Sequence, residues 1–156
     1  MRAVLQRVSE ASVAADGTLT GKIEKGLLIL LGVREGDDEK DADALAEKIS
    51  KLRIFSDEND KLNLSVTDVG GSVLVVSNFT LMADYKKGNR PSYTDSAAPA
   101  RACELYEYFI SKMKEKSITT KSGVFGADMA VSLVNDGPIT IVMDSEVLLR
   151  KGGFTV

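Results

Sequence analysis

Strand patterns dominate the distribution of apolar and polar positions along the chain. Residues 26–33, GLLILLGV, form a continuous apolar run between glycines, and such a run predicts a central strand buried on both faces. The stretch SVLVVSNFTL, after Gly70 and Gly71, predicts a second core strand. Residues 1–8 alternate in part and run into ASVAA, which predicts one or two strands. Asp16 and Gly17 are the turn signal of a following hairpin.

Helical spacing of apolar residues occurs twice. From Asp37 onward it predicts a helix of about four turns that ends near Arg53 and has acidic residues in its first turn. Pro99 opens the second predicted helix, because proline is tolerated in the first turn of a helix. The two apolar faces consist of Ala42, Leu45, Ile49 and Leu52 in the first helix and Ala102, Leu105, Phe109 and Met113 in the second.

The C-terminal part of the chain adds two predicted strands. They cover Met129–Val134 and Ile139–Met143, and residues 135–138 join them. Strands are in the majority and there are two main helices. The pattern therefore favours a mixed α/β fold in which sheet layers, or a barrel-like sheet, are covered by the helices. The 156 residues fit a single domain that spans residues 1–156.

Composition excludes several kinds of chemistry. The chain has no histidine, so a Ser-His-Asp triad and histidine metal ligands are both impossible. The acidic residues within 57–60 do not follow the spacing of a calcium loop, and no phosphate-binding glycine loop or dinucleotide fingerprint occurs. We therefore expect neither a metal nor a cofactor. Cys103 is the single cysteine, and we interpret it as a packing residue.

Charge and hydropathy narrow the partners and the location of the protein. The net charge of −3 argues against broad, non-specific attraction to nucleic acid, although it leaves room for a small basic patch. The longest apolar run, Leu27–Leu31, is too short to span a bilayer, and the first residues lack the apolar core of a signal peptide. We therefore expect a cytoplasmic protein that does not enter a membrane.

Polar residues follow the second core strand at Ser77, Asn78 and Thr80, which flank Phe79. Buried without partners, these groups would destabilise the fold. In one interpretation they satisfy backbone groups at the end of the strand, and Phe79 belongs to the core. In the other, hydroxyls and backbone N–H groups face a pocket, where such donors can hold a developing oxyanion. The motif alone does not decide between the two.

Three further segments allow two interpretations each. Residues 135–138 have the composition of a hairpin turn, but a cis Gly137-Pro138 peptide would instead expose a rigid backbone wall that could reject one stereoisomer. Residues 123–129, GVFGADM, form either a plain loop or a place where backbone N–H groups approach a ligand. In YKKGNRPS, residues 85–92, the cations are either solvated or contact phosphate.

Taken together, these segments resemble a known family. SNFTL, KKGNRPS, GVFGADM and SLVNDGPIT occur in an order and at spacings that resemble the D-aminoacyl-tRNA deacylase family. AVLQRVSEASV, GLLILLGV, RIFSD and GGSVLVVS fit as well, so the resemblance extends to about Met143. Residues 144–156 look like a C-terminal extension beyond the usual end of the family.

The resemblance implies a specific reaction. The family hydrolyses the ester that joins a D-amino acid, or glycine, to the 3′-terminal adenosine of tRNA, and it works as a homodimer with active sites at the subunit interface. Its Ser-Gln-Phe-Thr motif falls on Ser77–Thr80, so the expected catalytic residues are Ser77, Asn78, Phe79 and Thr80. Its cis Gly-Pro, which enters the partner's pocket and blocks L-amino acids, falls on Gly137 and Pro138. Arg7 matches the arginine that holds this Gly-Pro.

The remaining site predictions are less specific. We expect substrate contacts from Phe125, Ala127, Met129 and Asn135, and contacts to tRNA phosphate from Lys86, Lys87 and Arg90. One departure from the family motif is that Asn78 stands where the family has glutamine. Asparagine keeps the amide but is one methylene shorter, so a side-chain contact to the substrate would need another route.

The sequence is compatible with two mechanisms and with two other functions. Thr80 could be a nucleophile, but its hydroxyl needs a base and the chain has no histidine. We favour assistance by the ribose 2′-hydroxyl of the tRNA, with backbone N–H groups near Phe79 binding the oxyanion. The protein could instead be a non-catalytic, nucleic-acid-binding dimer of the same fold. It could also be tuned to mischarged glycyl-tRNA.

Overall fold

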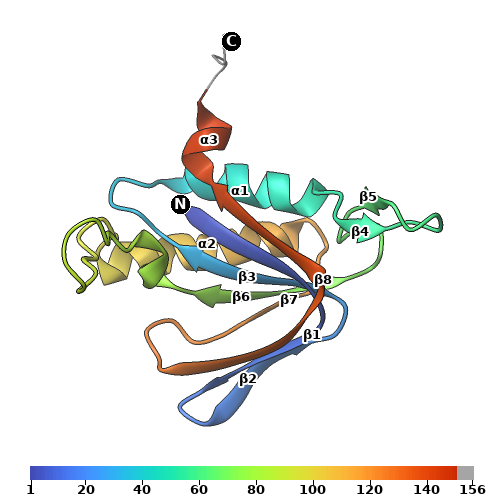
Figure 1. The fold of residues 1–156 in the computed structure, drawn as a ribbon, viewed down its shortest axis with the longest axis horizontal. Helices are drawn as coiled ribbons and strands as arrows, with labels where there is room; N and C mark the ends of the chain where they lie inside the picture. The colour runs from blue at the N-terminus through green and yellow to red at the C-terminus, as the bar shows by residue number, and fades with distance from the viewer. Residues whose placement is uncertain (151–156) are drawn as a thin grey trace.

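The computed structural model describes residues 1–150, which form a curled β-sheet with two helices packed on one side (Figure 1). The sheet contains six strands in a nearly closed, barrel-like arrangement, and its path runs β2-β1-β3-β6-β7 with β8 paired to β1. This confirms the predicted mixed α/β fold. The strands of the sheet are β1 (Arg2–Ala15), β2 (Thr18–Ile23), β3 (Gly26–Gly32), β6 (Ser72–Ser77), β7 (Thr120–Ser122) and β8 (Met129–Asp144).

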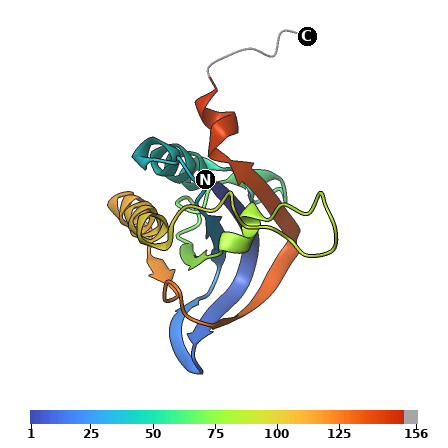
Figure 2. The ribbon, with the colours of Figure 1, turned by 90° about the vertical axis from the view of Figure 1, so that its left-hand side faces the viewer.

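The other elements lie around this sheet. Helices α1 (Glu39–Lys51) and α2 (Pro99–Glu115) run side by side across one face, and α3 (Ser145–Leu149) follows β8 (Figures 1 and 2). A short 3-10 helix, η1 (Phe79–Met82), follows β6 directly. Strands β4 (Phe55–Ser56) and β5 (Leu62–Leu64) form a separate two-stranded sheet. None of the helices within residues 1–150 is both long enough and apolar enough to cross a bilayer.

Strand β1 organises the sheet because three other strands pair with it. Its first half pairs with β3, its second half pairs with β2, and β8 runs antiparallel along its other edge. The β1–β2 hairpin turns at Asp16 and Gly17, whose φ angles of 49° and 82° lie in the left-handed region that Gly and Asp tolerate best. The segment before this hairpin, for which the sequence predicted one or two strands, is thus one long strand.

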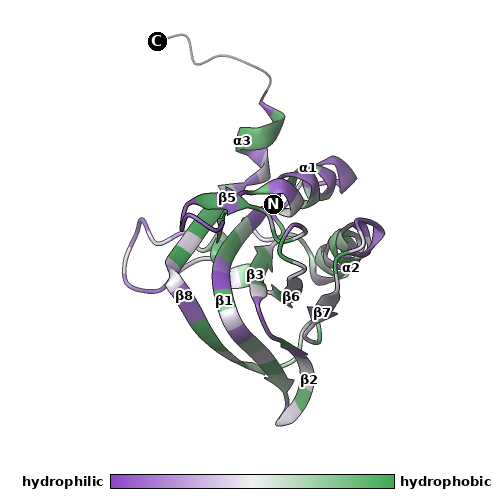
Figure 3. Ribbon diagram, turned by 90° about the vertical axis from the view of Figure 1, so that its right-hand side faces the viewer, coloured by the Kyte–Doolittle hydropathy of each residue, from purple (hydrophilic) through white to green (hydrophobic). Residues whose placement is uncertain are grey.

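The apolar strands divide the core into two parts. Alternate residues of β1, β3 and β6 face α1 and α2, where Leu5, Ile29 and Phe109 are fully buried. The residues between them, such as Leu28 and Leu74, face the interior of the curled sheet. Because β3 packs on both sides, its sequence is apolar at every position between its terminal glycines. In β1 and β8, by contrast, one face is more exposed than the other. Figure 3 shows that hydrophobic and hydrophilic residues alternate along these two strands.

Strand β8 differs from the sequence prediction. Two strands joined by a turn were expected, but residues 129–144 form a single strand along β1. Gln6 pairs with Thr140 and Val8 with Asn135, so one residue of β1 lies opposite residues 136–139. The hairpin interpretation is therefore wrong, because the chain keeps its direction and the extra residues form a wide bulge. We call residues 136–139 the Gly-Pro bulge; a proline fits there because bulged residues need no ladder hydrogen bond.

An ionic network joins the end of β8 to the start of the chain. One carboxylate oxygen of Asp144 accepts hydrogen bonds from Arg2 at 3.2 Å and from Arg34 at 3.1 Å. The other accepts from the Glu146 N–H, which caps α3. Arg2 also donates to the Leu81 carbonyl at 2.9 Å. The last turn of η1 is thus fixed to the C-terminal end of the sheet.

Candidate functional site

A cavity of about 620 Å³ opens where β6, η1, the N-terminal end of α2 and the segment before β8 meet. Its volume is within the range of small-molecule sites. Its walls are largely apolar, with a few polar groups near Ser77. The lining residues are Leu31, Val33, Ser77, Asn78, Phe79, Tyr93, Ser96, Ala97, Ala98, Pro99, Ala102, Tyr106, Phe125, Gly126, Ala127 and Met129.

The corner between β6 and η1 supplies the polar edge of this cavity. The Asn78 N–H donates to the Leu31 carbonyl at 2.8 Å, which continues the pairing of β6 with β3 by one residue. The next two N–H groups, of Phe79 and Thr80, donate to no acceptor within residues 1–150. They are the unpaired donors with which a helix begins, and they are available to a ligand.

Side chains hold this corner in place. The Thr80 hydroxyl donates to the Asn78 side-chain oxygen at 2.5 Å. The Ser96 hydroxyl donates to the Phe79 carbonyl at 3.2 Å. Arg2 holds the Leu81 carbonyl, as described above. Carbonyl groups of η1 are therefore bound from outside the turn, whereas its first N–H groups remain free.

Two aromatic rings flank the mouth of the cavity. Phe79 and Tyr93 meet edge to face, with ring centroids 5.1 Å apart and an interplanar angle of 70°. Phe79 is 59% exposed, so the interpretation in which it belongs to the core is wrong. An apolar side chain this exposed at a cavity mouth is suited to contact a flat ligand.

The back of the cavity is closed by Tyr106 and Phe125, whose ring centroids are 5.8 Å apart. The Tyr106 hydroxyl donates to the Val75 carbonyl at 2.9 Å, two residues before Ser77. Burial raises the pKa of Tyr106 to about 12, so the phenol stays protonated at neutral pH. Tyr106 thus serves the site as a fixed neutral donor.

The glycine-containing segment before β8 forms the remaining wall. Phe125, Ala127 and Met129 all line the cavity, as the sequence predicted for contacts to a substrate. Gly126 has a φ of +79°, and the Ala127 N–H closes a turn onto the Val124 carbonyl at 3.2 Å. The left-handed glycine lets the chain turn, and residues 125–127 all line the cavity.

The Gly-Pro bulge forms a second, separate feature. The Gly137-Pro138 peptide is cis. Arg7 donates to the Asp136 carbonyl at 3.1 Å and to the Ile54 carbonyl at 3.0 Å. The Asn135 amide nitrogen donates to the carbonyls of Arg7 and Ile139, which closes the bulge from the other side.

The bulge does not line the cavity of its own chain. Gly137, Pro138 and Asn135 are absent from the cavity walls, and both residues of the Gly-Pro pair are exposed. Arg7 contacts the bulge and not the cavity. The residues predicted from the two signature motifs therefore occupy two different surfaces of one chain.

The predicted phosphate contacts lie on a loop beside the cavity mouth. Residues 84–92, which we call the basic loop, connect η1 to Tyr93 and extend away from the body of the protein (Figure 2). Asp84 and Ser92 exchange two backbone hydrogen bonds of 2.8 Å at the base of the loop. Lys86, Lys87 and Arg90 are exposed, and none of the three forms an ion pair within residues 1–150.

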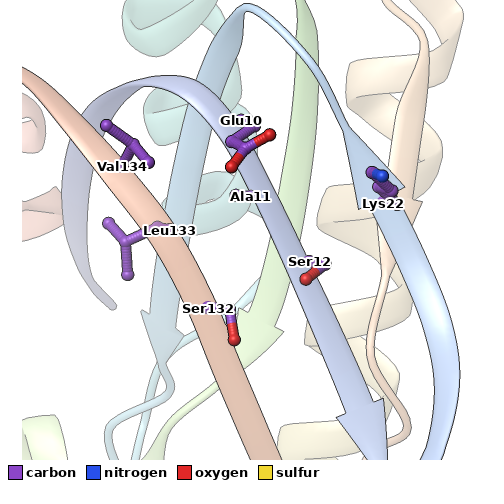
Figure 4. A pocket seen from close by; sticks show the side chains of 7 residues that line it. All are labelled: Glu10, Ala11, Ser12, Lys22, Ser132, Leu133 and Val134. Carbon is purple, nitrogen blue, oxygen red and sulfur yellow. The ribbon is translucent and has the colours of Figure 1, made fainter.

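A smaller hollow of about 190 Å³ lies elsewhere on the sheet, over β1, β2 and β8 (Figure 4). Glu10, Ser12, Lys22 and Ser132 are among its lining residues. None of the predicted site residues lines this hollow. The residues that sequence reasoning selected from SNFTL and GVFGADM all belong to the larger cavity, except Thr80, which is exposed beside it.

Sequence reasoning missed the residues that α2 and the preceding loop bring to the cavity. Tyr93, Ser96, Tyr106 and the small residues around Pro99 line it. The available signal was the run AAPA before a helix, because small side chains leave space next to a helix start. Within residues 1–150, no group of three His, Cys, Asp or Glu side chains is arranged to hold a metal ion.

Comparison with known proteins identifies the family. The family model described as D-Tyr-tRNA(Tyr) deacylase matches residues 4–144. A D-aminoacyl-tRNA deacylase from Koribacter versatilis is 58% identical over 146 residues, covering 94% of this chain and 98% of the relative. One from Geotalea uraniireducens is 53% identical over 152 residues, covering 97% and 98%.

Two solved structures share the fold of this chain. A structure described as c-Myc DNA Unwinding Element Binding Protein superposes with a TM-score of 0.86 at 37% identity, covering 92% of this chain and 98% of that one. A probable eukaryotic D-amino acid tRNA deacylase shares the fold, with a TM-score of 0.75 at 15% identity and the same coverage. The match to the family model and the identity to its curated relatives both cover nearly the whole length of the family. The chain therefore belongs to the D-Tyr-tRNA(Tyr) deacylase family.

Proposed function

We propose that this protein hydrolyses the ester bond of D-aminoacyl-tRNA and releases the amino acid and the tRNA. The observation that carries the proposal is the pair of free N–H groups of Phe79 and Thr80 at the edge of the cavity. Such donors stabilise the oxyanion that forms when an ester carbonyl is attacked. The names of the relatives supply the substrate class.

Water is the nucleophile in the reaction that we propose. Its oxygen attacks the ester carbonyl carbon, the negative charge develops on the carbonyl oxygen, and the bond to the ribose 3′-oxygen then breaks. The 3′-oxygen takes up a proton as it leaves. The chain contains no histidine to move these protons. We assign proton transfer to the neighbouring 2′-hydroxyl of the substrate.

Thr80 and Asn78 position the substrate in this mechanism and do not attack it. The Thr80 hydroxyl gives its hydrogen to Asn78, and no lysine or carboxylate within residues 1–150 accepts from it. A threonine nucleophile needs such a base. With its oxygen bound to Thr80, the Asn78 amide has its nitrogen left to donate toward the ligand.

Discrimination between D and L esters is assigned to the Gly-Pro bulge of a partner subunit. Gly137 and Pro138 are exposed and lie outside the cavity of their own chain, so they are free to enter the cavity of another. Arg7 donates to the Asp136 carbonyl and Asn135 to the Ile139 carbonyl, which fixes both ends of the bulge. Each of the two side chains makes one further hydrogen bond to a backbone carbonyl outside the bulge. A wall fixed in this way rejects an L side chain by collision, whereas a D side chain or glycine avoids it.

A partly exposed apolar stripe supports a homodimer. Val4 pairs with Leu30 on β3 and with Val142 on β8, on the face turned away from the helices. Val142 is 64% exposed. Along β8 the stripe ends beside Thr140, next to the Gly-Pro bulge. A second copy that covers the stripe would therefore lie close to the bulge. This proximity is needed if the bulge of one subunit is to enter the cavity of the other.

Phosphate contacts are assigned to Lys86, Lys87 and Arg90. Their lack of ion-pair partners within residues 1–150 leaves their charge available to RNA. Weak salt dependence together with unchanged binding after Lys86→Ala would contradict the assignment of the phosphate contacts.

Mischarged glycyl-tRNA is a further substrate of this proposal, because glycine has no side chain to meet the bulge.

A non-catalytic function in nucleic-acid binding is the second candidate. The neighbouring structure at 37% identity is described as a DNA-unwinding-element binding protein. Under this alternative, the chain would bind nucleic acid as a dimer and leave aminoacyl esters intact. The net charge of −3 does not favour it, because affinity for duplex DNA rests on the neutralisation of many phosphates.

Hydrolysis of matched substrates separates the two functions. D-tyrosyl-tRNA, L-tyrosyl-tRNA and glycyl-tRNA are incubated with the protein in metal-free buffer, and the remaining ester is measured over time. Rapid loss of the D ester with the L ester spared is the expected result. Stability of all three esters, with a shift of duplex DNA in the same preparation, would establish the second candidate instead.

A further inference from the structure

Tyr85 has no structural role in the fold of residues 1–150. Its side chain is 79% exposed, the highest value among the exposed large apolar side chains of that region. Neither its hydroxyl nor its ring contacts another residue through a hydrogen bond or an aromatic pair there. A single exposed aromatic residue is ordinary on a protein surface, so its neighbourhood has to decide whether it has a function.

The loop that carries Tyr85 is fixed at its base. Asp84 and Ser92 pair through two backbone hydrogen bonds of 2.8 Å, and the Asp84 carboxylate accepts from the Lys86 N–H at 3.0 Å. Tyr85 lies between these two anchored residues, whereas the turn at Gly88 is further out. The backbone that presents the ring is thus held, and little ordering is required when a ligand stacks on it.

The charge around Tyr85 is opposite to that of the whole protein. The basic loop carries three cations and one carboxylate, in a chain whose net charge is −3. The cations Lys86, Lys87 and Arg90 have no ion-pair partner within residues 1–150. An exposed aromatic ring among free cations is the combination with which proteins bind single-stranded nucleic acid, because the ring stacks on a base while the cations contact phosphates.

The position of Tyr85 relates it to the proposed reaction. Tyr85 follows Asp84 directly and Tyr93 follows Ser92 directly, so both tyrosines extend from the same backbone bridge. Tyr93 contacts Phe79 at the mouth of the cavity. A strand whose terminal adenosine occupies the cavity therefore leaves it beside the basic loop.

We propose that Tyr85 stacks on an unpaired base of the tRNA 3′ end, one of the nucleotides that precede the terminal adenosine. This inference rests on the proposed function, because it takes the esterified adenosine to be in the cavity. Stacking is tolerant of base identity. Tyr85 therefore contributes to affinity for the single strand as a whole and does not select the amino acid or the stereoisomer.

The test compares two substrates that differ only beyond the terminal adenosine. D-tyrosyl-tRNA offers the preceding bases, and D-tyrosyl-adenosine lacks them. Since a stacked base contributes about 1–3 kcal/mol, Tyr85→Ala should raise KM for the tRNA by about 5- to 150-fold and leave KM for the adenosine ester unchanged. Tyr85→Phe should keep the wild-type KM. Leu19→Ala is the matched control, because Leu19 is 59% exposed on β2.

Salt dependence distinguishes stacking from charge. Tyr85→Ala should lower affinity at every salt concentration without changing the slope of log affinity against log salt. Lys87→Ala should reduce that slope by about 0.7, the value for one phosphate contact on a single strand. An unchanged KM for the tRNA in Tyr85→Ala would overturn the inference, as would an equal rise with both substrates. A wild-type protein that cleaves neither ester would overturn the proposed function instead.

Discussion

The hydroxyl of Thr80 donates its hydrogen to the side-chain oxygen of Asn78 at 2.5 Å. The two residues whose roles the sequence left open are therefore partners in one hydrogen bond at the edge of the cavity. The bond directs the threonine hydrogen away from any base, and it fixes which end of the asparagine amide faces the ligand.

Removal of the Thr80 hydroxyl should therefore slow the reaction only moderately. We expect Thr80→Ala to lower kcat/KM by about tenfold or less, the effect of losing one neutral hydrogen bond of about 1 kcal/mol. Thr80→Ser keeps the donor and should stay near the wild type. Single-turnover kinetics with D-tyrosyl-tRNA measure both variants. Trapping of an acyl-Thr80 adduct, or a loss comparable with deletion of a nucleophile, would show that the substrate-assisted mechanism is incorrect.

Tyr106 stabilises the strand that leads into the catalytic corner. Tyr106→Phe removes one donor from the Val75 carbonyl, which keeps the Gly123 N–H at 3.2 Å, and we expect a loss of about 1 kcal/mol in the free energy of unfolding at neutral pH. The change should also lower kcat, because the strand that ends at Ser77 is less firmly held. Urea denaturation and deacylation of D-tyrosyl-tRNA measure the two effects.

The pKa of Tyr106 predicts how the difference in the free energy of unfolding between the wild type and Tyr106→Phe depends on pH. The folded-state pKa of about 12 lies above the ordinary value of 10.0, so the protonated form is favoured by folding. The resulting stability is fully present below about pH 10 and is lost as the pH rises from about 10 to 12. The gap between the wild type and Tyr106→Phe should narrow over this window. A gap that widens with rising pH would contradict the burial of the phenol.

Arg7 is predicted to control stereochemical selectivity. Its guanidinium reaches the Asp136 and Ile54 carbonyls through two different nitrogens. A lysine has a single ammonium head and cannot reproduce this geometry. We expect Arg7→Lys to reduce the ratio of D-ester to L-ester hydrolysis by tenfold or more, a change of about 1.4 kcal/mol in discrimination. Arg150→Lys, which alters an exposed arginine at the end of α3, is the control. An unchanged ratio with lower overall activity would assign Arg7 to stability alone.

A charge on the apolar stripe should separate the subunits. Val142→Asp places a carboxylate beside Val4, where a partner subunit is proposed to pack. We expect the variant to sediment as a monomer and to hydrolyse L-tyrosyl-tRNA as well as the D ester, because the bulge of the partner that rejects L side chains is then missing. Leu19→Asp changes a side chain of similar exposure, 59%, on β2 and should stay dimeric. A wild-type protein that is monomeric at micromolar concentration would rule out the shared site.

The sequence predicted the elements better than their connections. The continuous apolar run of β3, the Asp16-Gly17 hairpin and both helices were correct because each is determined by local residues. The β8 prediction failed because the residues around Pro138 favour a turn when considered locally. In the fold, β1 supplies a pairing partner on both sides of the bulge and keeps the chain extended.

The candidate site likewise combines residues that local sequence predicted with residues that only the fold brings together. Residues of SNFTL and GVFGADM were predicted, and the structure brings them to one cavity. Tyr93, Ser96 and Tyr106 were missed, because their spacing carries no signal and their approach depends on how α2 packs on the sheet. Phe79 was expected in the core under one interpretation, and only the fold reveals that its ring is exposed at the cavity mouth.

Strand pairing between β1 and β8 has a consequence for how the chain folds. The contact between Arg2 and Asp144 joins residues 142 positions apart. Contacts of such long sequence separation incur a large loop-closure entropy before they form, so they slow folding. Until β8 is in place, one edge of β1 is open along its length. We infer that a chain truncated before Met129 exposes that edge to other chains and aggregates, even though both helices and the apolar strands are complete.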